Sequence, residues 1–161
     1  MTSARVEHPG EVSAAYLHPG RVVAHGHGLH VVTILGSCVA VGLWDPTTSA
    51  GGMIHFVLPR APGLGARDPA RYGDSGIALM IERIRALGAN PSGLRAKVFG
   101  GAGVLRGNEP DGGRLGVENV EIALRSLLDE RIPIVAVETG GDRGRKIHFH
   151  TGDGSAWVKQ V

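Results

Sequence analysis

The sequence predicts a single-domain α+β fold. Short apolar runs typical of strands fill both ends of the chain, and two helical patterns lie between them. A chain of 161 residues suits one domain with a core of its own. Because strands and helices do not alternate regularly, we expect packed layers and no doubly wound sheet.

The first third of the chain predicts strands and then a loop. Residues 21–35 and 39–45 are apolar runs, and the second ends at the turn signal DPTTSAGG. A third apolar run, 53–59 (MIHFVLP), stops at Pro59. Residues 60–73 are rich in Pro, Gly and Arg, which predicts an exposed loop with a functional role.

Two amphipathic helices are predicted in the middle of the chain. Apolar residues recur at helical spacing between Ile77 and Leu87, with Asp74 or Ser75 as the cap and Gly88 as the stop. A second pattern begins at Val117 and ends near Arg131; its apolar positions are Val117, Val120, Ala123, Leu124, Leu127 and Leu128.

The segments around the second helix have simpler patterns. Residues 95–100 predict a short strand, and 108–116 (NEPDGGRLG) predict a loop. Residues 132–138 (IPIVAVE) predict a buried strand, and 145–150 with 155–161 predict a closing hairpin.

Composition excludes several classes of protein. The chain is 42% hydrophobic and 20% charged, as in globular proteins. No apolar run approaches the roughly 20 residues that a membrane helix needs, and the N-terminus has no apolar signal region. One cysteine forms no internal disulfide, so we expect a cytoplasmic protein. The net charge of +2 and the aromatic content of 4% do not favour nucleic-acid binding.

The single thiol, Cys38, lies in the stretch TILGSCVAV. A lone cysteine in such a domain is more often a small core residue than a nucleophile. Its sequence context favours a role as a nucleophile. Gly36 and Ser37 break the strand and leave backbone N–H groups free to face a ligand, as in an acyl-transfer oxyanion site. A thiol with a pKa of about 8.5 also needs a base.

His55 is the histidine whose surroundings suit that base. All its neighbours in MIHFVLP are apolar, so its ring must find a buried partner. It is either a core histidine bonded to backbone or a base that lowers the pKa of Cys38.

The other histidines have plainer explanations. His25, His27 and His30 suggest a metal site, but His30 falls on the opposite strand face and no second ligand cluster appears, so we predict no metal. His148 and His150 share a face of an amphipathic strand, where exposure is expected.

Several motifs together resemble the CheD family, chemoreceptor glutamine deamidases of bacterial chemotaxis. They are HPGRVVAHGHGLHVVTILGSCVAVGLWDP, GGMIHFVLP, RYGDSGIALMIERIRALGA, AKVFGGAGVL, GVENV and ETGGDRGRKIHF. They cover nearly the whole chain from about residue 12 onward, with a histidine 17 residues after the cysteine.

The resemblance implies an enzyme and a fold. Family members hydrolyse particular receptor glutamines to glutamate and ammonia, and some act on receptor glutamyl methyl esters. The nucleophile matches Cys38, the base matches His55, and a third catalytic residue matches Thr33. No cofactor is implied. The implied fold is a layered α/β/β sandwich similar to the cytotoxic necrotizing factor toxins, formed here by residues 1–161, with 1–11 flexible.

For the mechanism, we expect backbone N–H groups at Ser37 and Gly36 or Cys38 to hold the oxyanion. The expected partners are methyl-accepting chemotaxis receptors, with arginines of the 60–73 loop against their acidic side, and a CheC-type phosphatase. Glu118 stands where relatives often carry a basic residue, which leaves the CheC contact open. The alternative is a binding module without turnover that regulates such a phosphatase.

Overall fold

The computed structural model describes residues 5–6, 14–63, 65, 67–103 and 112–161. Within these ranges the elements are β1 (Arg5–Val6), β2 (Ala14–Tyr16), β3 (Arg21–His25), β4 (His30–Leu35), β5 (Val39–Trp44), β6 (Gly51–Phe56), η1 (Pro69–Arg71), α1 (Gly73–Ala86), η2 (Pro91–Gly93), β7 (Arg95–Gly100), α2 (Gly112–Asp129), β8 (Ile134–Thr139), β9 (Arg145–His150) and β10 (Ala156–Gln160).

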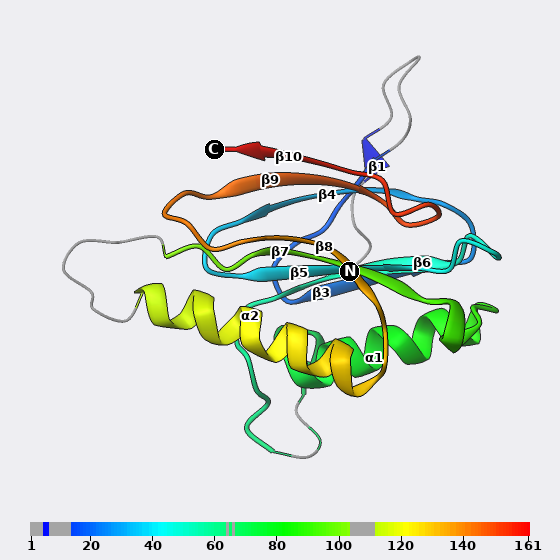
Figure 1. The fold of residues 1–161 in the computed structure, drawn as a ribbon, viewed down its shortest axis with the longest axis horizontal. Helices are drawn as coiled ribbons and strands as arrows, with labels where there is room; N and C mark the ends of the chain where they lie inside the picture. The colour runs from blue at the N-terminus through cyan, green and yellow to red at the C-terminus, as the bar shows by residue number, and fades with distance from the viewer. Residues whose placement is uncertain (1–4, 7–13, 64, 66, 104–111) are drawn as a thin grey trace.

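These elements form three layers. The outer sheet has the strand order β1-β2-β4-β9-β10, and the central sheet has the order β3-β6-β5-β7-β8. The outer sheet covers one face of the central sheet, and α1 and α2 cover the other (Figure 1). The predicted α+β class and its layered α/β/β arrangement are therefore confirmed.

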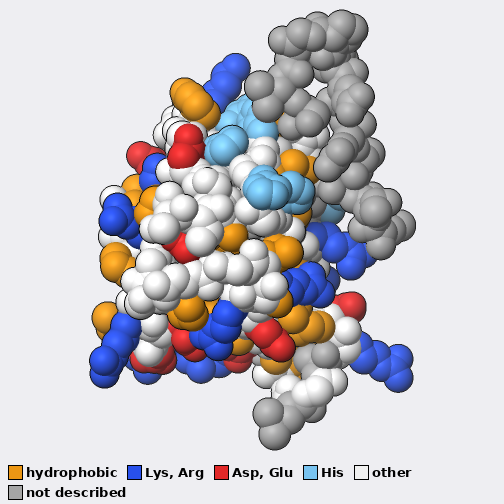
Figure 2. All heavy atoms as spheres, turned by 90° about the vertical axis from the view of Figure 1, so that its right-hand side faces the viewer, with side chains coloured by type: hydrophobic (Ala, Val, Ile, Leu, Met, Phe, Trp, Pro, Cys, Tyr) orange, Lys and Arg blue, Asp and Glu red, His pale blue; other side chains and the backbone are white. Residues whose placement is uncertain are grey.

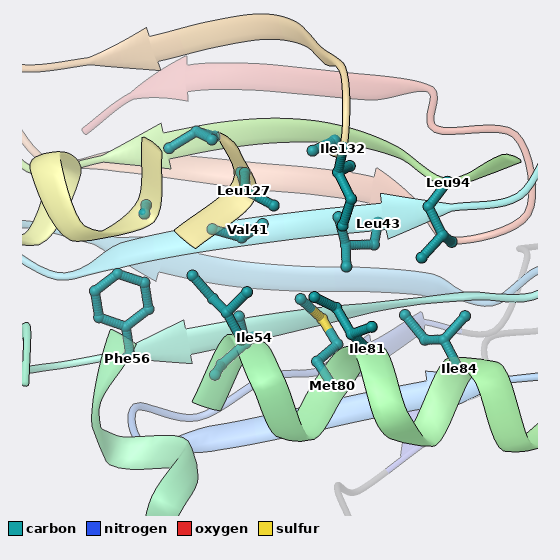
Figure 3. Packing of buried hydrophobic residues seen from close by; sticks show 14 of the residues in the cluster. Val41, Leu43, Ile54, Phe56, Met80, Ile81, Ile84, Leu94, Leu127 and Ile132 are labelled. Carbon is teal, nitrogen blue, oxygen red and sulfur yellow. The ribbon is translucent and has the colours of Figure 1, made fainter. Parts of the chain in front are cut away.

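Strands β5 and β6 of the central sheet are buried on both faces, and alternate residues of β5 pack into the two interfaces. Val41 and Leu43 pack with the helices, together with Ile54 and Met80 (Figure 3), whereas Ala40 packs between the sheets. This explains why residues 39–45 form a continuous apolar run. Gly42 lets the sheets approach, because a Cβ there would lie 2.5 Å from the ring of Phe149.

Helix α1 buries the predicted apolar residues from Ile77 to Ile84, but Leu87 lies just beyond its end and is exposed, and the helix begins earlier than predicted. Neither Asp74 nor Ser75 caps it: Tyr72 is the N-cap residue, and Asp74 instead accepts a hydrogen bond from the Ala61 N–H. The helix ends at Ala86, and Gly88 follows with a φ of +102°, as the predicted stop requires.

Two other predictions are wrong in their details. Residues 112–116 are the first residues of α2, and the rest of the predicted loop, 108–111, lies outside the described residues. The predicted buried strand became β8, an edge strand with Val135 51% and Val137 49% exposed. An apolar run does not reveal whether a strand will have neighbours on both sides.

Of the segment 1–11, the structure describes Arg5 and Val6, whose backbone pairs with β2; the other residues lie outside the described ranges. In the part of the chain that is described, no helix is long and apolar enough to span a membrane.

Candidate active site

Residues 36–38, which we call the GSC turn, connect β4 of the outer sheet to β5 of the central sheet. Cys38 immediately precedes β5, and its thiol is free and partly exposed. Its side chain packs against the cluster between the two sheets, as Ala40 does. The thiol is therefore neither sealed in the core nor turned toward the helices.

The strand register places His55 on the same face as Cys38. His55 of β6 is the direct partner of Ala40 on β5. Cys38 comes two residues before Ala40, so Cys38 and His55 are diagonal neighbours on one face of the sheet. Diagonal neighbours lie within reach of aromatic and long side chains.

Thr33 of β4 reaches His55 from the outer sheet. Its Oγ1 lies 2.7 Å from Nδ1 of His55 and donates a hydrogen bond to the Leu17 carbonyl, also at 2.7 Å. Because a carbonyl only accepts, the single hydroxyl proton is used at Leu17. Nδ1 of His55 must then carry the proton and donate to Thr33. This tautomer leaves Nε2 as the basic nitrogen.

Burial controls the protonation of both groups. His55 is only 1% exposed, and its burial lowers the pKa of the imidazole from 6.5 to about 4. Burial also raises the pKa of the Cys38 thiol. The resting pair is therefore a neutral thiol and a neutral imidazole. The role of His55 as the base that lowers the pKa of the thiol stays a prediction.

Arg71 partly opposes the effect of burial, because its positive charge lowers the pKa of Cys38. Its carbonyl accepts hydrogen bonds from the N–H groups of Val57, at 2.9 Å, and Leu58. Val57 follows β6 at the position that faces Cys38 in the extended register, so Arg71 is held beside the thiol.

The backbone of the GSC turn is held by its carbonyl groups. The N–H groups of Ala102 and Gly101 donate to the carbonyls of Gly36 and Cys38, each at 2.9 Å, and the Asn119 side chain donates to the carbonyl of Ser37 at 3.1 Å. The N–H of Cys38 contacts its own sulfur. Among the described residues, the N–H groups of Gly36 and Ser37 have no acceptor.

Four of the remaining histidines form two pairs. Figure 2 shows histidine side chains gathered at the end of the molecule where the β3–β4 and β9–β10 turns lie. His25 contacts the backbone of His27, whereas Nε2 of His30 lies 3.0 Å from Nδ1 of His148. The structure thus separates His30 from the other two members of the predicted trio. Within the described ranges, no three His, Cys, Asp or Glu residues are grouped to hold a metal.

A surface groove of about 880 Å³ lies along α2. It is lined by Pro59, Arg60 and the α2 residues Glu118, Glu121, Ile122, Leu124, Arg125, Leu128 and Asp129. Cys38, His55 and Thr33 do not line it. Glu118 is half-buried and pairs with Arg114 at 3.0 Å.

Two residues around the thiol were missed from the sequence. Arg71 was noted only as a loop cation. Asn119 was not singled out, although its position gives a signal: it is three residues after Gly116 and four before Ala123, on the buried face of α2. A polar residue on such a face needs a buried partner.

The fold is a layered α/β/β sandwich. Its candidate site contains a thiol, an imidazole and a hydroxyl, which are the groups that cysteine-dependent hydrolases use. Residues 57–160 match the family model described as CheD chemotactic sensory transduction. The chain belongs to the CheD family, as its sequence motifs predict.

Curated relatives are similar to this protein in sequence over most of the chain. A "Probable chemoreceptor glutamine deamidase CheD 1" of Anaeromyxobacter dehalogenans is 44% identical, covering 94% of this chain and 87% of the relative. A protein of the same name from Shewanella oneidensis is 39% identical, with 94% and 74% covered. A "Probable chemoreceptor glutamine deamidase CheD" of Rhodospirillum rubrum is 41% identical, with 91% and 81% covered.

Proposed function

We propose that this protein hydrolyses the side-chain carboxamide of glutamines in the cytoplasmic region of chemoreceptors, giving glutamate and ammonia. The names of the curated relatives support this substrate. The observation that carries the chemistry is the placement of Cys38 and His55 on one sheet face, with the His55 ring bonded to Thr33.

The first half of the reaction forms a thioester. Nε2 of His55 takes the Cys38 proton as the sulfur attacks the glutamine Cδ, because the resting pair is neutral. N–H groups of the GSC turn stabilise the resulting oxyanion. Protonated His55 then gives its proton to the departing nitrogen, and ammonia leaves as the carbonyl re-forms.

The second half restores the enzyme. His55 takes a proton from a water molecule, whose oxygen attacks the thioester carbon. The C–S bond breaks, glutamate leaves, and the proton returns to the sulfur. Thr33 accepts from Nδ1 throughout, which keeps Nε2 facing the reaction. A glutamyl methyl ester would follow the same route, with methanol leaving in place of ammonia.

Exposed arginines of the 60–73 loop are the proposed contacts with the receptor. Arg60, Arg67 and Arg71 are all exposed, and the Arg71 charge reaches Cys38. Cations there suit an acidic face of a receptor helix bundle. A CheC-type phosphatase is the second proposed partner, and the half-buried Glu118 is the residue whose charge would alter that contact.

The test is incubation of the protein with a recombinant chemoreceptor cytoplasmic fragment, followed by ammonia measurement and peptide mass spectrometry. Wild type should replace NH₂ by OH at particular glutamines, and Cys38→Ala should do so at none while keeping its circular dichroism. Equal activity in Cys38→Ala would refute the thiol mechanism. No change in any receptor, with unaltered phosphatase binding by Cys38→Ala, would instead support the binding module.

A further inference from the structure

Asn119 links the two segments that flank the thiol. It lies on α2, its side chain is 0% exposed, and its Nδ2 donates to the Ser37 carbonyl at 3.1 Å and to the Val57 carbonyl at 3.0 Å. Ser37 precedes the nucleophile, and Val57 is the residue that faces Cys38 from the end of β6. One amide group thus ties the GSC turn to the strand that carries His55.

The same stretch of α2 supports the turn by a second route. Gly116 packs directly on the backbone of residues 101–102, because a Cβ on Gly116 would lie 2.5 Å from the Gly101 carbonyl and 2.8 Å from that of Ala102. The N–H groups of Gly101 and Ala102 hold the carbonyls of Cys38 and Gly36. All three carbonyls of the GSC turn are therefore fixed by α2 or by a segment that α2 contacts.

Holding a carbonyl also orients the peptide N–H that follows it, since each peptide unit is planar. The Ser37 carbonyl shares a peptide plane with the Cys38 N–H, and the Gly36 carbonyl shares one with the Ser37 N–H. Carbonyls drawn toward α2 and residue 102 turn these two N–H groups the opposite way. Oriented N–H groups beside a nucleophile are what oxyanion stabilisation requires.

We propose that Asn119 is a positioning residue: through the Ser37 carbonyl it orients the GSC turn so that its N–H groups meet the oxyanion of the substrate amide. This role rests on the proposed deamidase function. Asn119 touches neither sulfur nor substrate, and it acts in the step in which negative charge develops on oxygen.

The role has a signature that a purely structural residue would lack. Removing one oxyanion donor typically lowers kcat by about 10²–10³-fold. Alkylation of a thiol by iodoacetamide forms no oxyanion and depends on thiolate formation. Loss of Asn119 should therefore slow deamidation while leaving alkylation of Cys38 almost unchanged.

The experiment measures both rates in Asn119→Ala and Asn119→Asp, with a chemoreceptor cytoplasmic fragment as the deamidation substrate. Asn119→Asp keeps the shape but places a carboxylate oxygen where Nδ2 donates to two carbonyls. We expect kcat to fall by roughly 10²-fold in both variants with KM little changed. The alkylation rate should stay within about threefold of wild type, because the thiol is untouched.

Leu127→Ala is the matched control. Leu127 is a fully buried residue of the same helix and belongs to the core cluster between the helices and the central sheet. Its truncation should lower the melting temperature and leave kcat within about threefold of wild type, since it touches no part of the turn.

Each other outcome overturns the proposal. Unchanged kcat in a folded Asn119 variant, or an equal loss of deamidation and alkylation, would remove the oxyanion role. Asn119 variants that unfold where Leu127→Ala stays folded would assign the residue to stability alone. An inactive wild type would refute the proposed function itself, and this role with it.

Discussion

The hydroxyl of Thr33 in the outer sheet lies 2.7 Å from Nδ1 of His55 in the central sheet. The two layers are therefore joined by a polar contact inside the interface that also holds the apolar cluster of Leu35, Ala40 and Phe149. Thr33 and His55 are both buried, and the chain of bonds ends at the Leu17 carbonyl. The contact fixes one tautomer of the ring, so fold and proposed chemistry depend on the same hydroxyl.

Replacing this hydroxyl should damage catalysis more than binding. Thr33→Val keeps the volume but leaves the His55 N–H and the Leu17 carbonyl without their partner. We expect kcat for deamidation to fall between about 10-fold and 10²-fold, because general-base catalysis contributes at least 10²-fold. Unpaired buried groups should also lower the free energy of unfolding by about 1–3 kcal/mol. Steady-state kinetics and urea unfolding measure the two effects.

Thr33→Ser is the control for that substitution, since it retains the hydroxyl. It should recover most of kcat, although it loses a methyl group from the interface. Equal kcat in the valine and serine variants would show that the bond to His55 has no part in catalysis.

The free energy of unfolding should depend on pH through His55. The pKa of His55 is about 4 in the folded protein and near its ordinary 6.5 in the unfolded chain. As the pH falls below 6.5, His55 becomes protonated in the unfolded chain but stays neutral in the folded protein. The free energy of unfolding therefore decreases until about pH 4. Between pH 7.5 and pH 5, His55 alone should lower the free energy of unfolding by about 2 kcal/mol.

His55→Gln isolates this contribution, because the pKa values of His30 and His148 are also lowered by burial and act in the same direction. Urea unfolding of both proteins at pH 7.5 and 5 gives the difference. Wild type should lose more stability than the variant. The same loss in both would mean that His55 is not buried neutral.

Local pattern was enough to predict the strands that carry Cys38 and His55. Residues 39–45 and 53–59 are mostly apolar because β5 and β6 are covered on both faces, and a short window of sequence is enough to show that pattern. The pairing of Thr33 with His55 depends on how two sheets stack. No periodicity reveals such a contact, and only the family resemblance pointed to Thr33.

The start of α2 shows why helix boundaries are harder to predict. Gly112, Gly113 and Gly116 weaken the helical signal, because glycine is a poor helix former. At Gly116 the missing side chain is what allows the close approach to Gly101. Tertiary packing therefore requires glycine at a position where helix propensity disfavours it. Asn119 lies one turn later and was missed for the same reason.

Charge reversal in the loop should weaken receptor binding without altering the thiol. Arg60 is exposed and lines the groove beside α2. Arg60→Glu should raise KM for a receptor cytoplasmic fragment severalfold, and the effect should shrink at high salt, as for an exposed charge. Arg95→Glu is the control, because Arg95 pairs with Trp44 at the far end of β5. Equal KM values in the two variants would exclude Arg60 as a receptor contact.

Arg71 should set how readily Cys38 ionises. Its positive charge lowers the pKa of a thiol that burial raises, so removal of the charge should shift the pH profile of iodoacetamide alkylation toward higher pH. Since Arg71 is exposed, we expect the rate at pH 7 to fall only about twofold to fivefold in Arg71→Ala, corresponding to at most about 1 kcal/mol. Arg71→Lys should keep the wild-type profile, because it keeps the charge, and Arg95→Ala should do so because it lies far from the turn. An unshifted profile in Arg71→Ala, measured at low salt where screening is weakest, would mean that the backbone of residue 71 matters at this site and its guanidinium does not.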